Sequence, residues 1–220
     1  MKRRICIYSF IVLFGLLLFA SCDDRGPETI SDYDVVYTNY DNKEDFSKVK
    51  TYHMPDSVVF ILSKDDYGVV NHNYDQTLLE SVKSNLDALG WTEVPYEDLG
   101  TVEPDVFVTV SAITATWVQQ YWYDDWWDYW DWYPFYPDWG WGPGYYPWFG
   151  YPVYYTTYDT GTVFIEMTDP SKTDQNKKQI PVIWVGAING LLEGSQVNQR
   201  IQKNVDQAFY QSPYLKGDIN

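Results

Sequence analysis

The sequence predicts an α+β fold, in which two helices pack on one face of a mostly antiparallel sheet of about five strands, with a long aromatic-rich hairpin insert between two of the strands. Three observations lead to this fold class. Two segments carry apolar residues at helical spacing, five carry alternating or continuous apolar residues, and one is dominated by Trp and Tyr. A chain of 220 residues is long enough for one ordinary domain and too short for two separate cores.

Residues 1–21 have the layout of an export signal. Lys2, Arg3 and Arg4 form a basic head, and the following residues to Ala20 are almost all apolar. As a helix rising about 1.5 Å per residue, this run would extend roughly 24 Å, which is shorter than the ~30 Å hydrocarbon core of a bilayer. We therefore expect a cleaved signal peptide rather than a permanent transmembrane helix.

The end of this segment, Leu18 to Cys22, resembles the bacterial lipobox, in which small residues precede a cysteine that receives lipid. Ala20 and Ser21 fit the motif, whereas Phe19 replaces the usual Leu. The alternative is ordinary secretory cleavage after Cys22. The lipobox interpretation predicts lipid attachment at Cys22, with the membrane as partner through the acylated cysteine.

The location within the envelope depends on residues 22–31, an acidic tether that begins Cys22-Asp23-Asp24. In some Gram-negative bacteria Asp after the lipidated cysteine resembles an inner-membrane retention signal. In others a short acidic run there is similar to the signal for the outer face of the outer membrane. A plain solvated tether is the third interpretation. We predict a lipid-anchored protein of the outer membrane, with the periplasmic or surface face left open.

Charge and cysteine content exclude several classes of function. The formal net charge of the chain is -16, and it repels phosphate backbones, so nucleic-acid binding is not expected. The chain has two cysteines, Cys6 in the signal and Cys22 at the lipobox. The folded domain would therefore hold no thiol for a disulfide, a zinc site or a nucleophile.

Residues 32–213 are predicted to form the single domain, followed by a tail at 214–220. Strands are expected at 33–37 and 49–53, as a pair separated by a polar turn at 41–43. A helix follows, with Asn73 as its N-cap and Gly90 as its end. Its apolar stripe consists of Leu78, Leu79, Val82, Leu86 and Leu89.

Three further strands and a second helix complete the predicted domain. The strands run from Asp105 towards Val118, between Gly161 and Asp169, and over 182–188. The second helix is expected to open at Ser195 and to stop before Pro213. Its apolar stripe consists of Val197, Ile201, Val205, Ala208 and Phe209.

The insert at 119–158, called here the aromatic block, holds most of the Trp residues and contains no Lys or Arg. At helical spacing Asp124, Asp128 and Asp131 share one face of a short amphipathic segment. These carboxylates form either a weak divalent-cation site or a solvated acidic face. No cofactor is predicted.

The aromatic side chains of the block have three interpretations. They form a platform that stacks on a glycan, with Trp126, Trp127, Trp130 and Trp132 as ligand-binding residues; they rest on the membrane interface; or they pack against each other and the open sheet face. Full exposure of so many aromatic side chains would favour aggregation, so some burial or a partner is required.

Several short segments in order resemble a known family. They are EDFSKVKTYHM at 44–54, ALGW at 88–91, PDVFVTV at 104–110, GTVFIEMTD at 161–169 and VIWVGA at 182–187. Together they are similar to the bacterial lipoprotein family catalogued as domain of unknown function 4136, over most of 32–213. The resemblance implies a fold and a cell-envelope location, but no activity.

No common catalytic or nucleotide-binding motif occurs in the sequence. His53 and His72 are interpreted as surface or capping residues rather than catalytic bases. We therefore predict a noncatalytic module that presents an aromatic surface to an envelope protein or glycan. The alternative is a structural scaffold or oligomer subunit in which the aromatic block is packed core, and an enzyme is not expected.

Overall fold

The computed structural model describes residues 35–61, 71–113, 146–148 and 161–217. They all belong to one compact unit of the chain, Tyr33–Asn220. Within these residues eight strands join into one sheet in the order β1-β8-β7-β5-β2-β4, with β3 beside β5 and β6 beside β8. The strands are β1 (Val36–Tyr40), β2 (Thr51–His53), β3 (Val59–Ile61), β4 (Thr92–Glu93), β5 (Val106–Ile113), β6 (Tyr146–Trp148), β7 (Val163–Thr168) and β8 (Gln179–Ile188).

The sheet is mixed, which corrects the expectation of a mostly antiparallel sheet of about five strands. The long strands β1, β8, β7 and β5 pair with one another in antiparallel fashion. The short strands differ: β2 runs parallel to β4 and β5, β3 runs parallel to β5, and β6 runs parallel to β8. The prediction included β2, within 49–53, but missed β3, β4 and β6, because two or three residues carry no readable alternation.

The first two strands do not pair with each other, contrary to the predicted strand pair. β1 pairs with β8 at one edge of the sheet, while β2 pairs with β4 and β5 near the other. Between them lies a 3-10 helix, η2 (Phe46–Lys48), whose Phe46 is buried in the core. The chain therefore crosses from one edge of the sheet towards the other, with Phe46 held in the core. The polar turn at 41–43 does not connect two paired strands.

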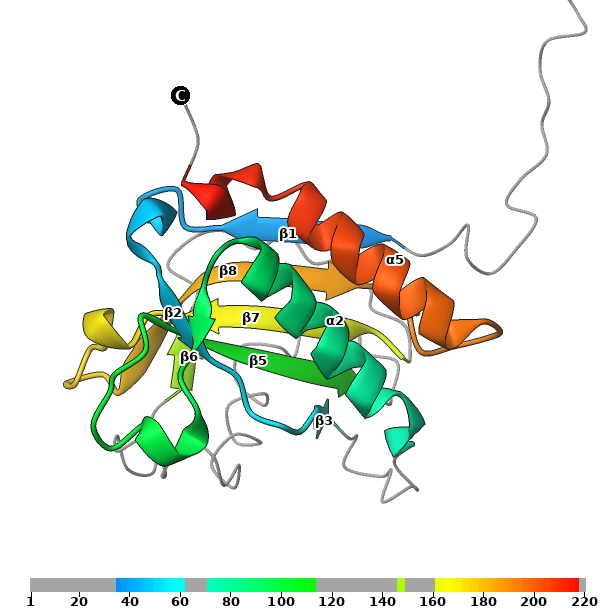
Figure 1. The fold of residues 1–220 in the computed structure, drawn as a ribbon, viewed down its shortest axis with the longest axis horizontal. Coiled ribbons are helices and arrows are strands. Elements are labelled where there is room, and N and C mark those ends of the chain that lie inside the picture. Colours follow the sequence, from blue (N-terminus) through cyan, green and yellow to red (C-terminus); the bar gives the residue numbers. More distant parts are fainter. Residues whose placement is uncertain (1–34, 62–70, 114–145, 149–160, 218–220) are drawn as a thin grey trace, which may run out of the picture. The chain divides into compact units, whose positions relative to one another are not determined.

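Two helices, α2 (Asp75–Ala88) and α5 (Val197–Tyr210), lie on the same side of the sheet, as predicted (Figure 1). We call the sheet surface beneath them the helix face. Gly90 follows α2 with a φ of 84°, which favours glycine. The predicted N-caps are wrong, because Asn71 caps a 3-10 turn before α2 and Gln196, in the left-handed conformation, precedes α5.

The core fills the space between the helices and the helix face. From α2 it takes Leu78, Val82 and Leu86, and from α5 it takes Ile201 and Val205, all fully buried. Each such side chain contributes about 1.5 to 3 kcal/mol through removal of apolar surface from water. The sheet contributes Val106, Val108, Val110 and Ala112 from β5, Val163, Ile165 and Met167 from β7, and Ile183, Trp184 and Ile188 from β8.

Within the described residues, no helix is long and apolar enough to cross a membrane. The predicted signal, tether and most of the aromatic block fall outside these residues. The described part of the block is β6, which adds a short strand beside Gln179–Pro181 of β8.

Candidate functional site

The site residues predicted from the sequence lie outside the described residues. These are Cys22, the tryptophans Trp126, Trp127, Trp130 and Trp132, and the acidic residues Asp124, Asp128 and Asp131. One Trp of the aromatic block is described: Trp148 at the end of β6, whose surface is 39% exposed. The candidate site is therefore built from the surroundings of this strand.

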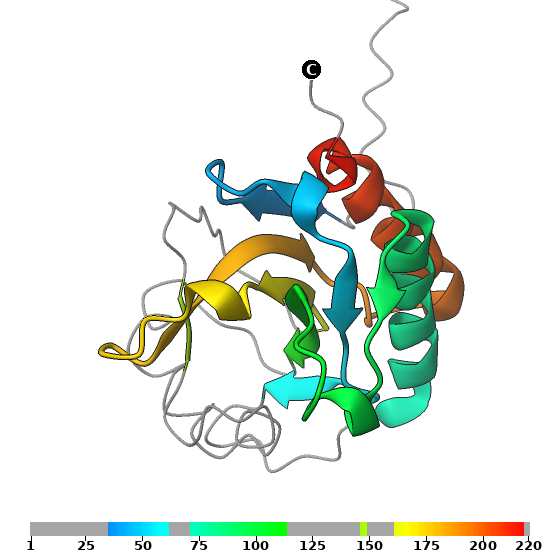
Figure 2. The ribbon, with the colours of Figure 1, turned by 60° about the vertical axis from the view of Figure 1, so that its left-hand side comes forward.

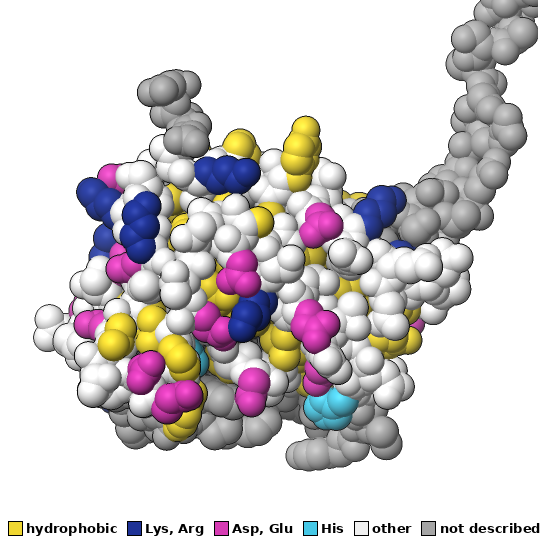
Figure 3. All heavy atoms as spheres, viewed as in Figure 1, with side chains coloured by type: hydrophobic (Ala, Val, Ile, Leu, Met, Phe, Trp, Pro, Cys, Tyr) yellow, Lys and Arg dark blue, Asp and Glu magenta, His cyan; other side chains and the backbone are white. Residues whose placement is uncertain are grey.

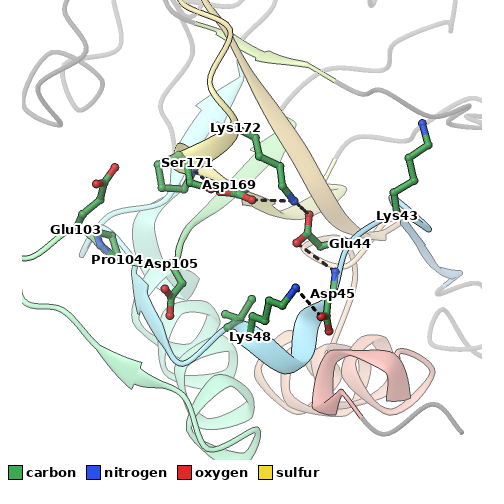
Figure 4. A pocket seen from close by; sticks show the side chains of 12 residues that line it. Lys43, Glu44, Asp45, Lys48, Glu103, Pro104, Asp105, Asp169, Ser171 and Lys172 are labelled. Atoms are coloured by element: carbon green, nitrogen blue, oxygen red, sulfur yellow. Dashed lines mark hydrogen bonds and ion pairs between the residues drawn. The ribbon is translucent and has the colours of Figure 1, made fainter.

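A charged groove of about 490 Å³ lies at the end of the sheet where β5 begins and β7 ends (Figure 4). Three segments far apart in the sequence line it. They are the stretch 43–49 around η2, the stretch 103–105 before β5, and the 3-10 helix η6 (Pro170–Lys172) after β7. Several basic side chains gather toward the end of the helix side where η2 lies, while acidic side chains are spread over that side (Figure 3).

Asp169 and Lys172 organise one wall of the groove. The Asp169 Oδ1 atom accepts hydrogen bonds from Ser171, at 2.9 Å from the backbone N and 2.6 Å from Oγ. Lys172 Nζ lies 3.1 Å from Asp169 Oδ2 and also pairs with Glu44. Partial burial disfavours the charged form of Lys172, but these two carboxylates outweigh it and raise the pKa of the lysine.

Asp105 organises the opposite wall. Its Oδ2 atom accepts hydrogen bonds from the backbone N–H groups of Lys50 and Thr51, both at 2.8 Å, and from Thr51 Oγ1 at 3.0 Å. This carboxylate therefore fixes the start of β2 beside the start of β5. Among the described residues, the side chains of Lys43 and Glu103 also line the groove and make no ion pair or hydrogen bond.

The exposed Trp148 is connected to the residues of this groove by strand pairing. Trp148 is the register partner of Pro181 on β8. The carbonyl oxygen of Pro181 accepts a hydrogen bond from the backbone N–H of Asp169, at 3.0 Å. An exposed aromatic ring and a charged groove thus share one end of the sheet, separated by one strand.

A second polar site lies on the sheet face opposite the helices, which we call the second face. Glu166 on β7 is only 4% exposed, and burial raises the pKa of its carboxyl to about 7. Ser111 Oγ and Thr168 Oγ1 are also buried on this face and have no hydrogen-bond partner. No described residue forms an ion pair or hydrogen bond with the Glu166 side chain.

The sequence interpretation missed both sites. The groove combines segments from three parts of the chain, and no local sequence pattern predicts that these segments lie together. Glu166 alternates with the apolar Val163, Ile165 and Met167, so periodicity places it on a solvent-exposed face. Its burial is a tertiary effect.

The two histidines have different environments. His53 is buried, contrary to the expected surface position, and its Nδ1 lies 2.8 Å from the carbonyl oxygen of Val94. It borders a smaller pocket of about 450 Å³ next to Pro55 and Tyr96. His72 is exposed beside Asp75 at the start of α2, with 2.7 Å between Nδ1 and Oδ2. No group of three or more metal-ligating side chains occurs within the described ranges.

Comparison with known proteins identifies the family but no activity. Residues 36–214 match the domain of unknown function DUF4136. A DUF4136 family protein from Bacteroides thetaiotaomicron is 25% identical, with a TM-score of 0.60, over 84% of this chain and 98% of that chain. No curated protein matches the sequence.

Two other solved structures are more distant. A PDZ domain protein from Parabacteroides distasonis is 15% identical, with a TM-score of 0.40 over 82% of this chain and 36% of that chain. The PelC dodecamer from Paraburkholderia phytofirmans is 10% identical, with a TM-score of 0.33 over 79% and 95%. Because the family match spans most of the folded unit, the chain belongs to the DUF4136 family.

Proposed function

We propose that this protein is a cell-envelope lipoprotein, anchored by acylated Cys22 to the outer membrane, whose domain is a noncatalytic binding module for an envelope glycan. The observation that carries the binding role is the exposed Trp148 beside the charged groove. The lipobox-like Leu18–Cys22 supports the anchor.

The chemistry of the two features is complementary for a glycan. A flat indole ring offers an apolar face to a sugar ring, and the side chains of the groove offer donors and acceptors to its hydroxyl groups. Lys43 and Glu103 are suited to this because their side chains have no partner among the described residues. Trp126, Trp127, Trp130 and Trp132 would extend the platform.

A recognition role suits the groove better than acid–base chemistry. Asp105 and Asp169 are each held by several hydrogen bonds, and Lys172 is held by two carboxylates. The two carboxylates raise the pKa of Lys172, so the lysine stays a charged donor near neutral pH. The hydrogen bonds hold these side chains in fixed positions, which suits them to bind a polar ligand.

The binding role is tested with purified peptidoglycan and a glycan array. Trp148→Ala should weaken binding at least tenfold, and the pair Trp126→Ala plus Trp130→Ala should weaken it further. Tyr210→Ala is the matched control, because Tyr210 is an exposed aromatic residue on α5, with 82% of its surface accessible. Equal retention of all these variants on the glycan would contradict the proposal.

The anchor is tested separately in cells. Cys22→Ser should release the protein from the membrane fraction and abolish labelling with a fatty-acid analogue. A variant that keeps the label would remove Cys22 as the attachment site, whatever the result of the glycan experiment.

A purely structural scaffold is the second candidate function. The buried state of Glu166, Ser111 and Thr168 on the second face favours it, because part of the chain must pack there. Loss of stability, without loss of glycan binding, in the tryptophan variants would support this candidate.

A further inference from the structure

The second face of the sheet is as well buried as the helix face. Strand register places Thr109, Glu166 and Val185 in one row across β5, β7 and β8, and Ser111, Phe164 and Ala187 in the next row. Each of these six side chains is at most 5% exposed. None belongs to the core cluster that the two helices cover.

Neither helix accounts for this burial. Both α2 and α5 lie on the helix face. In Figure 2, where the view is turned by 60°, both helices are seen on the same side of the sheet. Phe107 and Phe164 on the second face are large apolar side chains, and their removal from water requires a packed layer. Something other than the described helices supplies that layer.

The ends of the insert fix where the connecting chain must run. Ile113, the last residue of β5, and Gly161, just before β7, are joined by a backbone hydrogen bond of 2.8 Å. Both lie near Ile188, the end of β8 that pairs with Val163. The described part of the insert, β6, pairs instead with Gln179–Pro181 at the opposite end of β8.

The two connections, from Ile113 to Tyr146 and from Trp148 to Gly161, therefore each join points at opposite ends of β8. From Ile188 to Pro181 the distance along β8 is about 23 Å, at about 3.3 Å per residue. The return segment, residues 149–160, reaches at most about 40 Å when fully extended. The helix face is filled by α2 and α5, so the second face is the one that these helices leave open to a connecting segment.

We propose that the aromatic block covers the second face of the sheet, so that the domain has two cores, one under the helices and one under the block. This inference does not rest on the glycan proposal. It limits the glycan platform to those aromatic side chains of the block that do not face the sheet.

The chemistry of the face fits this occupant. Phe107, Phe164 and Val185 offer an apolar floor to aromatic rings. The buried Ser111 and Thr168 hydroxyls and the Glu166 carboxyl offer acceptors to indole N–H and phenol O–H groups. The block has many such neutral donors and no Lys or Arg, which agrees with the raised pKa of Glu166.

Thiol labelling tests the cover in the full chain. In a background of Cys6→Ser and Cys22→Ser, Ser111→Cys reports on the second face, its neighbour Ala112→Cys on the helix face, and Tyr210→Cys on solvent. We expect the thiol at 111 to react at least a hundredfold more slowly than that at 210, as slowly as that at 112. Replacement of the block by a short Gly-containing turn should accelerate labelling at 111 and leave 112 unchanged.

Two results of this experiment would overturn the inference. One is labelling at 111 as fast as at 210 in the full chain. The other is slow labelling at 111 that depends on protein concentration, because it would assign the cover to a second copy of the chain.

A crosslinking experiment keeps the test valid if the shortened chain does not fold. Phe164→p-benzoylphenylalanine in the full chain should, on irradiation, crosslink within the same chain to peptides from residues 114–160. Ile165→p-benzoylphenylalanine is the matched control and should crosslink to peptides of α2 or α5. Crosslinks from position 164 between chains, or to no part of 114–160, would contradict the proposal.

Discussion

The two faces of the sheet are buried to the same degree but are built from different residues. On the helix face, β5 presents Val106, Val108 and Val110 to two amphipathic helices. On the second face, the same strand presents Phe107, Thr109 and Ser111. The comparison teaches that polarity on alternate positions of a strand does not identify a solvent-exposed face. Here it marks a buried face that is more polar than the opposite one.

The difference extends to the charges on the two faces. The helix side buries Arg200 of α5, whose guanidinium donates to the carbonyl oxygens of Glu193 and Gly190, whereas the second face buries the carboxyl of Glu166 without a partner among the described residues. A buried carboxyl without a charged partner loses hydration, and this loss raises its pKa. Burial of this carboxyl therefore makes the contribution of the second face to stability depend on pH.

Truncation of neighbouring residues on the two faces gives the largest expected effect. Ile165→Ala on the helix face should lower the free energy of unfolding by about 2 to 5 kcal/mol, and Phe164→Ala on the second face by about 3 to 5 kcal/mol. Both side chains are at most 1% exposed. Urea denaturation of both variants measures the comparison. A loss under about 1 kcal/mol for Phe164→Ala alone would mean that the second face is not a core.

The carboxyl of Glu166 provides a second, pH-dependent effect. Its pKa is about 7 in the folded protein, against 4.5 for the ordinary group. At pH 4 both states are protonated and the group has little effect. As pH rises from 4.5 to 7 the unfolded chain ionises first, so the folded state loses stability, and the loss levels off above pH 7.

Glu166→Gln removes this ionisation. We expect the stability of the variant relative to the natural protein to increase from pH 4 to pH 7, reaching roughly 3 kcal/mol at about 1.4 kcal/mol per pKa unit. Thermal or urea unfolding across this pH range measures it. Glu103→Gln, at an exposed position in the groove, is the control for loss of a carboxylate. A flat difference for Glu166→Gln would show that the carboxyl is solvated or paired.

A close approach on the helix face gives an intermediate effect. The indole of Trp184 packs over Gly186, so a Cβ added there would lie 2.8 Å from its Cη2 atom. Trp184 is fully buried, and its Nε1 donates to Ser212 Oγ at 3.0 Å. Gly186→Ala should therefore cost about 1 to 3 kcal/mol through overpacking.

The matched variant for this position is Ala187→Gly, which changes the second face at the next residue of β8. It removes one methyl group and creates no clash, so its loss should be the smaller of the two. Chemical denaturation of the two variants tests this order. Equal losses would show that the Trp184 ring moves aside without cost.

The sequence predicted the helices better than the pairing of the strands. Leu78, Val82 and Leu86 recur at the helical period because α2 has one buried stripe. The predicted helix starts were wrong for two reasons. Asn71 caps a 3-10 turn that precedes α2, and Gln196 precedes α5 in the left-handed conformation. The pairing of β1 with β8 depends on contacts across the whole chain, which no window of sequence contains.

The candidate sites were beyond local patterns for a related reason. Glu44, Asp105 and Lys172 line one groove only because the segment before η2, the residues before β5 and the helix η6 lie at the same end of the sheet. Likewise the alternation within 163–168 does not report that Glu166 is buried. Motif searching detects chemistry within one segment, whereas here the charged groups are brought together by topology.

The smallest expected effect on stability concerns the groove. Lys172 pairs with Asp169 and Glu44 but is half exposed, so its ion pairs are screened by water. Lys172→Gln should lower the free energy of unfolding by less than about 1 kcal/mol. Lys177→Gln is the matched control, because Lys177 lies 3.5 Å from Asp174 in an i,i+3 pair and does not line the groove.

Binding separates these two lysine variants where stability does not. If the groove contacts the glycan, Lys172→Gln should weaken binding severalfold, both by loss of a donor and by release of Glu44 and Asp169 from their positions. Lys177→Gln should leave binding unchanged. Suppose that the two lysine variants bind equally well and that Trp148→Ala loses binding. Recognition would then be restricted to the aromatic side chains. The ion pairs of the groove would have only a structural role, to attach η6 to the segment before η2.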